Sequence, residues 1–281
     1  MMPASRFEQP ASIADALAGL ARGGMRPLAG GTDLYPAHVG RAIETPWLDL
    51  SRIATLRGIR SDAQGWWFGT TTTWMDVQRA ATPPLFDALK LAAREIGGEQ
   101  IQNSATLGGN LCNASPAADG TPVWLALDAQ LELQSARGIR HLPVDHFILG
   151  NRHTALAGDE LLTAIRVPQR SASAKSSFAK LGSRHYLVIS ISMVAVALDF
   201  DARTQVTWAR AAVGSCSPVA QRLPELEARL IGQPRNSLAQ VPVTPADLAP
   251  LRPISDVRAS AMYRLDATAT LLQRVLQELG R

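Results

Sequence analysis

Two glycine pairs, each beside a threonine, carry the clearest chemical signal in the chain. The first lies in the segment LAGGTDL at residues 28–34, and the second lies in TLGGNL at residues 106–111. Glycine lets the backbone come close to a ligand, and bare N–H groups in such a turn form a concave site for an anion. A single glycine pair often marks an ordinary turn. Two such segments, both without lysine, predict a binding surface for a diphosphate.

The polar side chains of both segments fit this interpretation, with one exception. Thr32, Thr106 and Asn110 add neutral hydrogen-bond donors. Asp33 carries a carboxylate, which repels phosphate. We expect Asp33 to cap neighbouring N–H groups or to hold the loop, so that its backbone rather than its side chain meets the ligand.

The motifs of several other kinds of site are missing from the sequence. There is no GxGxxG after a strand, no GK[ST] after glycines, no HExxH and no GxSxG. The five histidines are scattered, and the two cysteines, Cys112 and Cys216, lack the spacing of a four-ligand metal or iron–sulfur site. We therefore predict no catalytic residue and no metal ligand on this chain.

The order of the motifs resembles a known family along essentially the whole chain. AGGTDL at 29–34, and TLGGNL at 106–111 followed by NASPAAD to Asp119, look like the two pyrophosphate-binding segments of the FAD-binding (medium) subunit of the xanthine oxidase family of molybdenum hydroxylases. Carbon monoxide dehydrogenase medium subunits belong to that family. The likeness continues through ELLTAIRVP at 160–168, FAKLGSRHY at 178–186 and GSCSPVAQRLPELEARLIG at 214–232.

The resemblance implies a set of FAD contacts from both segments and from two later strands. The first segment supplies Leu28, Ala29, Gly30, Gly31, Thr32, Asp33 and Leu34, and the second supplies Ala105, Thr106, Gly109 and Asn110. Gly108 completes the second pair, and Ile101, which leads into it, is expected at the flavin edge. Asp119 matches a residue that hydrogen-bonds ribityl or ribose hydroxyls, Leu162 one that lines the adenine or flavin pocket, and Lys180 one near the isoalloxazine.

Two points near the flavin have alternatives. Lys180 could equally be a solvated strand lysine, whereas beside the flavin its cation would favour the anionic reduced form. Arg184, His185 and Tyr186 could form a turn on the surface, or the tyrosine could stack on or shield the flavin face.

By the same resemblance, the chain is expected to be an electron-transfer flavoprotein subunit. Substrate oxidation then takes place at a molybdopterin centre on a large partner subunit. Electrons pass through two two-iron, two-sulfur clusters on a small partner subunit to FAD and then to an external acceptor, in a dimer of heterotrimers. The alternatives are a self-contained FAD-dependent oxidase, for which the region after Ser177 is small, and a non-enzymatic nucleotide-binding module.

Composition bounds the class of protein. The 281 residues are 46% hydrophobic and 19% charged, with a formal net charge of +4, which is ordinary for a globular chain. Arginines are spread along the chain without interleaved aromatics, so no nucleic-acid partner is predicted. No signal peptide is expected at the N-terminus, and no apolar run approaches the ~20 residues of a membrane span. We expect a cytoplasmic protein, with export on a partner's signal as the alternative.

The elements that would position the two segments follow from periodicity and turn residues. We expect a helix from Ser12 and a strand at 26–29 that runs into the first glycine pair. Further strands are expected at 47–50, 56–61, 65–69, 130–134, 139–143 and 161–167, and helices at 74–80 and 85–96, whereas 119–127 is expected to be a helix or buried coil. The Ser/Ala-rich stretch 170–177 is the predicted linker.

Beyond this linker, the pattern predicts strands at 177–182, 189–200 and 206–215, and helices at 223–231 and 259–279. Met262 begins the apolar stripe of the last helix, so it is expected to pack in the core. The predicted fold class is α+β, in agreement with the fold that the resemblance implies. A two-part FAD-binding domain of the PCMH type, residues 1–57 and 58–170, precedes a C-terminal domain, residues 177–281, with a three-stranded antiparallel sheet packed with helices.

Overall fold

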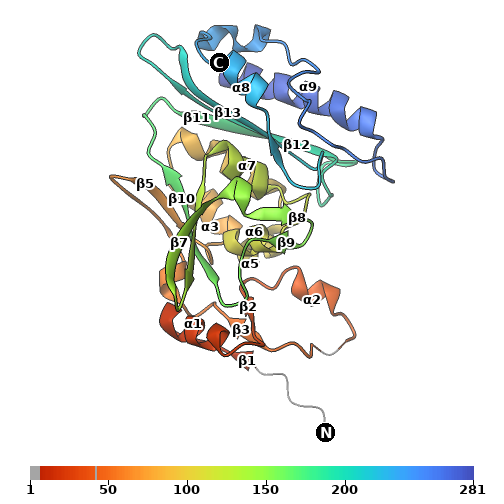
Figure 1. The fold of residues 1–281 in the computed structure, drawn as a ribbon. Helices are drawn as coiled ribbons and strands as arrows, with labels where there is room; N and C mark the ends of the chain where they lie inside the picture. The colour runs from red at the N-terminus through yellow and green to blue at the C-terminus, as the bar shows by residue number, and fades with distance from the viewer. Residues whose placement is uncertain (1–6, 42) are drawn as a thin grey trace.

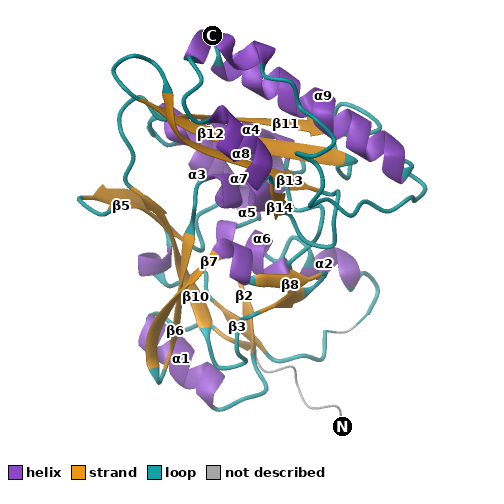
Figure 2. Ribbon diagram, turned by 45° about the horizontal axis from the view of Figure 1, so that its top comes forward, coloured by secondary structure: helices purple, strands orange, loops and turns teal. Residues whose placement is uncertain are grey.

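The computed structural model describes residues 7–41 and 43–281. The first six residues, where no signal peptide is predicted, lie outside this range. Among the described residues, three larger sheets follow one another along the molecule, with helices between and beside them (Figure 1), and β8 (Ile148–Gly150) and β9 (His153–Thr154) form a separate two-stranded sheet. Figure 2 shows α1 (Ile13–Ala21) at one end and α9 (Ala261–Leu279) at the other. No helix of the described residues is long and apolar enough to cross a membrane.

The N-terminal sheet is small and parallel. β1 (Phe7–Glu8) and β2 (Arg26–Leu28) both pair with β3 (Trp47–Asp49), in the order β1-β3-β2. The predicted start of α1 is confirmed, because the Ser12 hydroxyl accepts a hydrogen bond from the Asp15 N–H at 3.1 Å. β2 ends at Leu28, so the first glycine segment leaves the end of this strand and leads into the short helix α2 (Leu34–Ala37).

The central sheet is antiparallel and has five strands. They are β4 (Ile59–Asp62), β5 (Gly65–Gly69), β10 (Leu161–Pro168), β6 (Gln130–Ser135) and β7 (Gly138–Pro143), in this spatial order. The predicted hairpin of β6 and β7 is confirmed. β10 lies in the middle of the sheet, between the β4–β5 hairpin and the β6–β7 hairpin. Both hairpins precede β10 along the chain, so this later strand joins them into one sheet.

Helices pack against the central sheet around an aromatic core. They are α3 (Trp74–Arg79), α4 (Asp87–Glu95), α5 (Glu99–Ser104), α6 (Leu107–Asn113) and α7 (Gly120–Ala126). The Phe68 ring lies 5.1 Å from Phe86 and 5.3 Å from Trp124, and all three are fully buried. Burial of one such side chain contributes roughly 1.5–3 kcal/mol. The predicted helix at 85–96 begins as a 3-10 turn at Pro84–Phe86 and becomes α-helical at Asp87.

The C-terminal sheet has four antiparallel strands, not the three that were predicted. Its order is β11 (Lys175–Leu181), β12 (Ser192–Phe200), β13 (Val206–Gly214) and β14 (Gln221–Arg222). The two-residue β14 has no apolar alternation, which is why the sequence pattern missed it. α9 packs on one face, α4 and α7 pack on the other, and α8 (Pro224–Leu230) adjoins β13. With both faces covered, every residue of β12 is buried.

Two further predictions in this region differ from the structure. The predicted linker 170–177 contains no helix or strand as far as Ala174, but its last three residues belong to β11, where the buried Ser176 hydroxyl donates to the Leu85 carbonyl oxygen at 2.6 Å. Serine composition alone cannot reveal such a partner, because Leu85 lies far along the chain. Met262 is 79% exposed rather than packed in the core, since the buried stripe of α9 begins two residues later, at Arg264.

The carboxylate of Asp128 joins the end of α7 to the C-terminal sheet. Asp128 follows α7 with a left-handed φ of 52°. It accepts hydrogen bonds from Arg210 Nε at 2.7 Å, Arg222 Nη1 at 3.2 Å and Trp208 Nε1 at 3.3 Å, all on the C-terminal sheet. Arg170, in the connecting segment, adds a fourth contact at 3.2 Å.

Replacement of Asp128 by Asn should loosen this junction. Asparagine tolerates the left-handed backbone but removes the charge from a cluster of partly buried arginines, so we expect a loss of about 1–3 kcal/mol in the free energy of unfolding. Urea denaturation would measure it. Asp266→Asn, at an exposed position on α9, is the control and should change stability little. Equal stability of the two variants would contradict the assignment of Asp128 as the joining residue.

Candidate cofactor site

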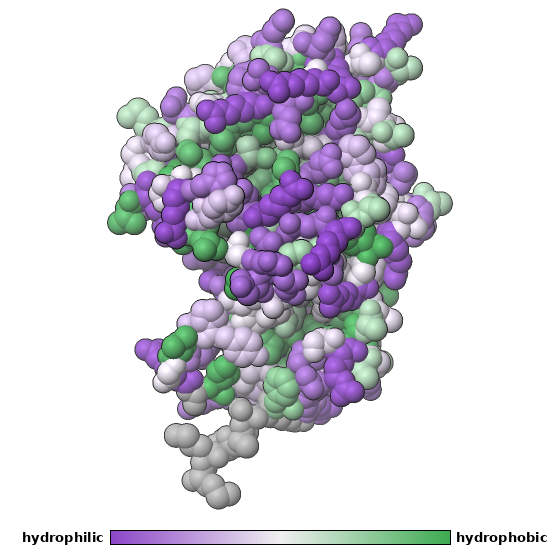
Figure 3. Space-filling model, turned by 180° about the vertical axis from the view of Figure 1, so that it is seen from behind, coloured by the Kyte–Doolittle hydropathy of each residue, from purple (hydrophilic) through white to green (hydrophobic). Residues whose placement is uncertain are grey.

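The two glycine segments meet in one groove of about 510 Å³. Twelve of the predicted contacts line it: Leu28, Ala29, Gly30, Gly31, Thr32, Asp33, Leu34, Ile101, Ala105, Thr106, Gly109 and Asn110. The groove lies where the first glycine segment, at the end of the N-terminal sheet, meets α5 and α6. Seen from behind, the outline of the molecule narrows between its N-terminal part and the larger part that contains the other sheets (Figure 3). The predicted convergence of two segments that are distant along the chain is therefore confirmed.

Gly30 is the point of closest approach between the segments. A Cβ atom added there would lie 2.0 Å from the Ser104 carbonyl oxygen and 3.1 Å from Ala105 Cα. Any side chain would push the segments apart. Gly31 has a φ of +66°, in the left-handed region that favours glycine.

The first segment offers unpaired backbone donors. Within the described residues, no hydrogen bond uses the N–H groups of Gly30, Gly31, Thr32 or Asp33. The Gly31 carbonyl, by contrast, accepts from the Tyr35 N–H at 3.0 Å, which fixes the bend. A run of free amides on a fixed bend is a site for an anion.

The second segment differs from its prediction, because its amides are not free. Residues 107–113 form α6, and the Thr106 hydroxyl caps the Gly109 N–H at 3.1 Å. The N–H groups of Leu107 and Gly108 donate to the carbonyl oxygens of Thr72 and Thr70, at 3.0 and 2.8 Å. The second segment therefore contributes a surface with small side chains rather than a set of free backbone N–H groups.

The two glycines of this second pair have different positions. A Cβ atom on Gly108 would lie 2.6 Å from Thr70 Cβ, so Gly108 lets α6 pack against the preceding strand end and does not line the groove. Gly109 does line the groove, and an added Cβ there would meet only the Thr106 hydroxyl within 4 Å. A ligand can therefore approach the backbone of α6 at Gly109.

Three buried polar atoms on groove residues lack a hydrogen-bond partner among residues 7–41 and 43–281. They are Trp47 Nε1, Trp74 Nε1 and Asn110 Oδ1. Nearly all buried polar groups in folded proteins are hydrogen-bonded, so two indole donors and one amide acceptor without partners indicate a ligand with both acceptors and donors. Free amides beside them add anion-binding capacity. The residues present therefore fit a dinucleotide that carries hydroxyls, ring nitrogens and a diphosphate.

These tryptophans, together with Cys112 and Asn113 at the end of α6, were not predicted to line the site. Trp47 belongs to a predicted strand and Trp74 begins a predicted helix, and both elements are present. That an indole N–H is buried without a partner becomes visible only in the tertiary structure.

Asp33 does not have the capping role that was expected of it. It precedes α2, but its side chain accepts no capping hydrogen bond. Its carboxylate instead forms an ion pair with Arg152, a residue that the sequence did not single out.

Asp119, Lys180 and Leu162 lie outside the groove. The Lys180 ammonium donates to Asp119 Oδ2 at 2.8 Å, and the Ser190 hydroxyl donates to Asp119 Oδ1 at 2.7 Å. Burial raises the pKa of Asp119, and the neighbouring Lys180 opposes this shift. The alternative of a solvated Lys180 is wrong, since its side chain is 5% exposed. Leu162 is buried in β10, where its carbonyl oxygen accepts from the Thr70 hydroxyl at 2.9 Å.

Arg184, His185 and Tyr186 form an exposed turn in this structure. The guanidinium of Arg184 donates to the carbonyl oxygens of Tyr186 and Leu187, at 3.0 and 2.6 Å, and curls the turn. Tyr186 is exposed and packs edge-on against His185. This agrees with the surface-turn alternative, and a shielding role for Tyr186 stays a prediction.

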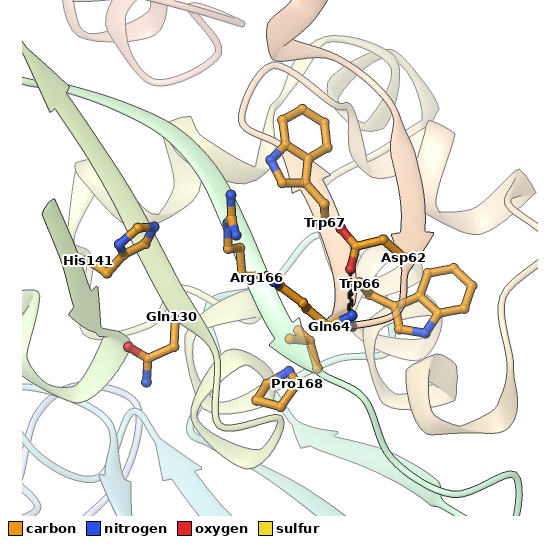
Figure 4. Close-up of a pocket in the computed structure, with 10 residues that line it drawn as sticks. Asp62, Gln64, Trp66, Trp67, Gln130, His141, Arg166 and Pro168 are labelled. Atoms are coloured by element: carbon orange, nitrogen blue, oxygen red, sulfur yellow. Dashed lines mark hydrogen bonds between the residues drawn. The ribbon is translucent and has the colours of Figure 1, made fainter. Parts of the chain in front are cut away.

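A second pocket, of about 320 Å³, lies on the central sheet and shares no residue with the groove. Figure 4 shows its side chains, which come from β4 to β7 and β10, with Asp62 bonded to the Gln64 N–H at 2.8 Å. Arg166 Nη2 lies 2.8 Å and His141 Nε2 lies 3.6 Å from the Glu132 carboxylate. Neither glycine segment contributes to the lining of this pocket.

Comparison with known proteins identifies the family. Residues 3–170 match the family model described as the FAD binding domain in molybdopterin dehydrogenase. The chain belongs to this family. Residues 177–279 match a second model, the CO dehydrogenase flavoprotein C-terminal domain. The chain is thus the FAD-binding subunit of a molybdenum hydroxylase-type oxidoreductase.

Relatives of full length support this membership. The chain is 31% identical to the xanthine dehydrogenase FAD-binding subunit of Escherichia coli O157:H7, over 99% of this chain and 97% of that protein. It is 29% identical to the carbon monoxide dehydrogenase medium chain of Hydrogenophaga pseudoflava, over 98% and 96%. A crystal structure of the Cu,Mo-CO dehydrogenase superposes with a TM-score of 0.87 at 27% identity, covering 100% of this chain and 99% of that one.

In this FAD-binding subunit, Lys180→Met should lower the stability of the fold, because it leaves the buried Asp119 carboxylate without a partner. Asp119 would lose its counter-ion while remaining buried, and we expect the free energy of unfolding to fall by about 3–5 kcal/mol. Denaturant titration would measure this. The double variant Asp119→Asn/Lys180→Met is the matched control and should recover much of the loss. A single variant as stable as the double would show that the pair does not carry this energy.

Proposed function

We propose that this subunit receives electrons from iron–sulfur clusters on a small partner subunit and passes them through FAD to an external acceptor. The observation that carries the proposal is the groove in which the first segment presents four unpaired amides opposite the surface of α6. Bound FAD would supply the redox chemistry, because it can accept and release electrons singly. The chain's own residues then serve to bind, orient and shield the cofactor.

The donors of the groove suggest how FAD is held. We propose that the amides of Gly30, Gly31, Thr32 and Asp33 donate to the diphosphate, which is an arrangement that requires no lysine. The unpartnered groups of Trp47, Trp74 and Asn110 would bond to the remaining polar atoms of the cofactor. Gly109 would let the ligand lie against the backbone of α6.

Asp119, Lys180 and Leu162 are proposed as contacts at the flavin end. Support comes from the resemblance of their motifs and from the position of the Asp119–Lys180 pair, which joins the start of α7 to β11. A paired carboxylate and ammonium can bond to a flavin ring and its hydroxyl chain while adding no net charge.

The proposed partners are a small iron–sulfur subunit and a large subunit with molybdopterin, in a cytoplasmic dimer of heterotrimers. The name of the Hydrogenophaga relative, a medium chain, supports a multi-subunit enzyme. We also propose the division at 1–57, 58–170 and 177–281. It is supported by separate hydrophobic clusters, around Leu48 for the first part and around α9 for the last.

Co-purification with the neighbouring subunits tests the proposal directly. The complex should contain FAD, molybdenum and iron, and substrate should reduce the flavin in the complex but not in this chain alone. Reduction of the flavin by a substrate in the isolated chain would indicate a self-contained oxidase instead. A chain that binds nucleotides without a flavin spectrum would indicate a nucleotide-binding module.

Gly109→Val tests the groove itself. The branched side chain would project from α6 into the space that a ligand must occupy, so FAD affinity should fall at least about tenfold, as measured by flavin fluorescence. Gly158→Val is the control, because an added Cβ at Gly158 meets no atom within 4 Å. If Gly109→Val kept full flavin occupancy while folded, the groove would not be the FAD site.

A further inference from the structure

The carboxylate of Asp33 is unfavourable for the proposed cofactor site. It lies in the lining of the groove, next to the amides of Gly31 and Thr32 that we propose to hold the diphosphate. An unpaired carboxylate there would repel the bound anion, and the groove contains no lysine to offset it. A nearby cation is therefore required if the site is to bind a diphosphate well.

Arg152 supplies that cation from a different part of the chain. It lies in the turn between β8 (Ile148–Gly150) and β9 (His153–Thr154), and its guanidinium pairs with the Asp33 carboxylate. The Arg152 N–H donates to the Ala114 carbonyl oxygen at 3.0 Å, at the C-terminal end of α6. Arg152 thus contacts the first glycine segment and the C-terminal end of α6, the helix that contains the second glycine pair.

The backbone at this junction is held in an uncommon conformation. Arg152 has a φ of 58° and Ala114 a φ of 47°, and neither is a glycine. Two left-handed residues joined by one hydrogen bond persist only where the surrounding structure requires that geometry. The turn therefore keeps the guanidinium of Arg152 beside Asp33.

Exposure indicates that this ion pair does not serve the stability of the fold. The side chains of Arg152 and Asp33 are 55% and 57% exposed, and exposed ion pairs contribute little to folding. The same charges act more strongly on an anion bound in the adjoining groove. A bound ligand excludes solvent from the groove, so the electrostatic interaction is screened less there.

We propose that Arg152 is a positioning residue for the cofactor: it neutralises Asp33 and ties the first glycine segment to the end of α6, so that the groove accepts a diphosphate. The proposal rests on the proposed function, in which this groove binds FAD. Arg26 also lines the groove, near Trp47, but no ion pair links it to Asp33. The neutralising cation is therefore Arg152.

A double-mutant cycle on the full chain tests the proposal, with FAD affinity measured by fluorescence titration at low salt. Arg152→Gln should weaken binding about 10- to 100-fold, because Asp33 is left unpaired. Asp33→Asn alone should bind as tightly as the wild type or more tightly. In the double variant, affinity should return to within about threefold of the wild type, since the charge that needs neutralising is gone.

The controls separate this effect from misfolding and from a failed site. Arg137→Gln breaks another exposed arginine–aspartate pair, with Asp159, that takes no part in the groove, and should leave FAD affinity unchanged. Arg152→Lys keeps the charge and should retain most of the affinity even if Arg152→Gln does not fold. Thermal unfolding of Arg152→Gln should match that of Arg137→Gln.

Each remaining outcome overturns a specific claim. Unchanged affinity in Arg152→Gln, or in Arg152→Lys a loss as large as that in Arg152→Gln, would contradict the role of Arg152. A double variant as weak as Arg152→Gln would show that neutralisation of Asp33 is not its action. If the wild-type chain itself did not bind FAD, the proposed function would fail instead.

Discussion

The site depends on the contact between the backbone of Gly30 and the carbonyl of Ser104. Only a residue without a side chain lets the end of β2 lie this close to the end of α5. The groove is lined by residues on both sides of this contact, from the first glycine segment and from α5 and α6. The N-terminal sheet fixes the position of the first glycine segment, and the central helices fix the position of the second. Most of the chain before β10 is therefore needed to set the distance between the two segments.

Two carboxylates in this region are paired with cations. Asp33, which lines the groove, is matched by Arg152, and the buried Asp119, which lies outside the groove, is matched by Lys180. In the proposed mode of binding, backbone amides hold the diphosphate, because such donors cost little space and carry no net charge. This arrangement suits a cofactor that combines a dianionic diphosphate with a flavin ring, because the two ends of such a ligand require different electrostatic surroundings.

The C-terminal sheet is joined to this cofactor region rather than merely attached to it. Its inner face packs on α4 and α7, and its strands supply Lys180 to one carboxylate and Arg210 and Arg222 to another. The outer face is covered by α8 and α9. Covering both faces explains the continuous burial of β12 and leaves the sheet little freedom to move relative to α7.

The α+β class, most of the strands and helices, and the two glycine segments could be predicted from the sequence, because periodicity, caps and glycine conformation are local properties. Which groups those segments offer to a ligand depends on contacts made only in the folded chain. The amides at Gly108 and Leu107 are taken by Thr70 and Thr72, and the indoles of Trp47 and Trp74 are buried without partners. Asp33 meets Arg152, 119 residues later. Such partners lie far apart along the chain, and local patterns contain no information about which distant groups will satisfy a donor or a charge.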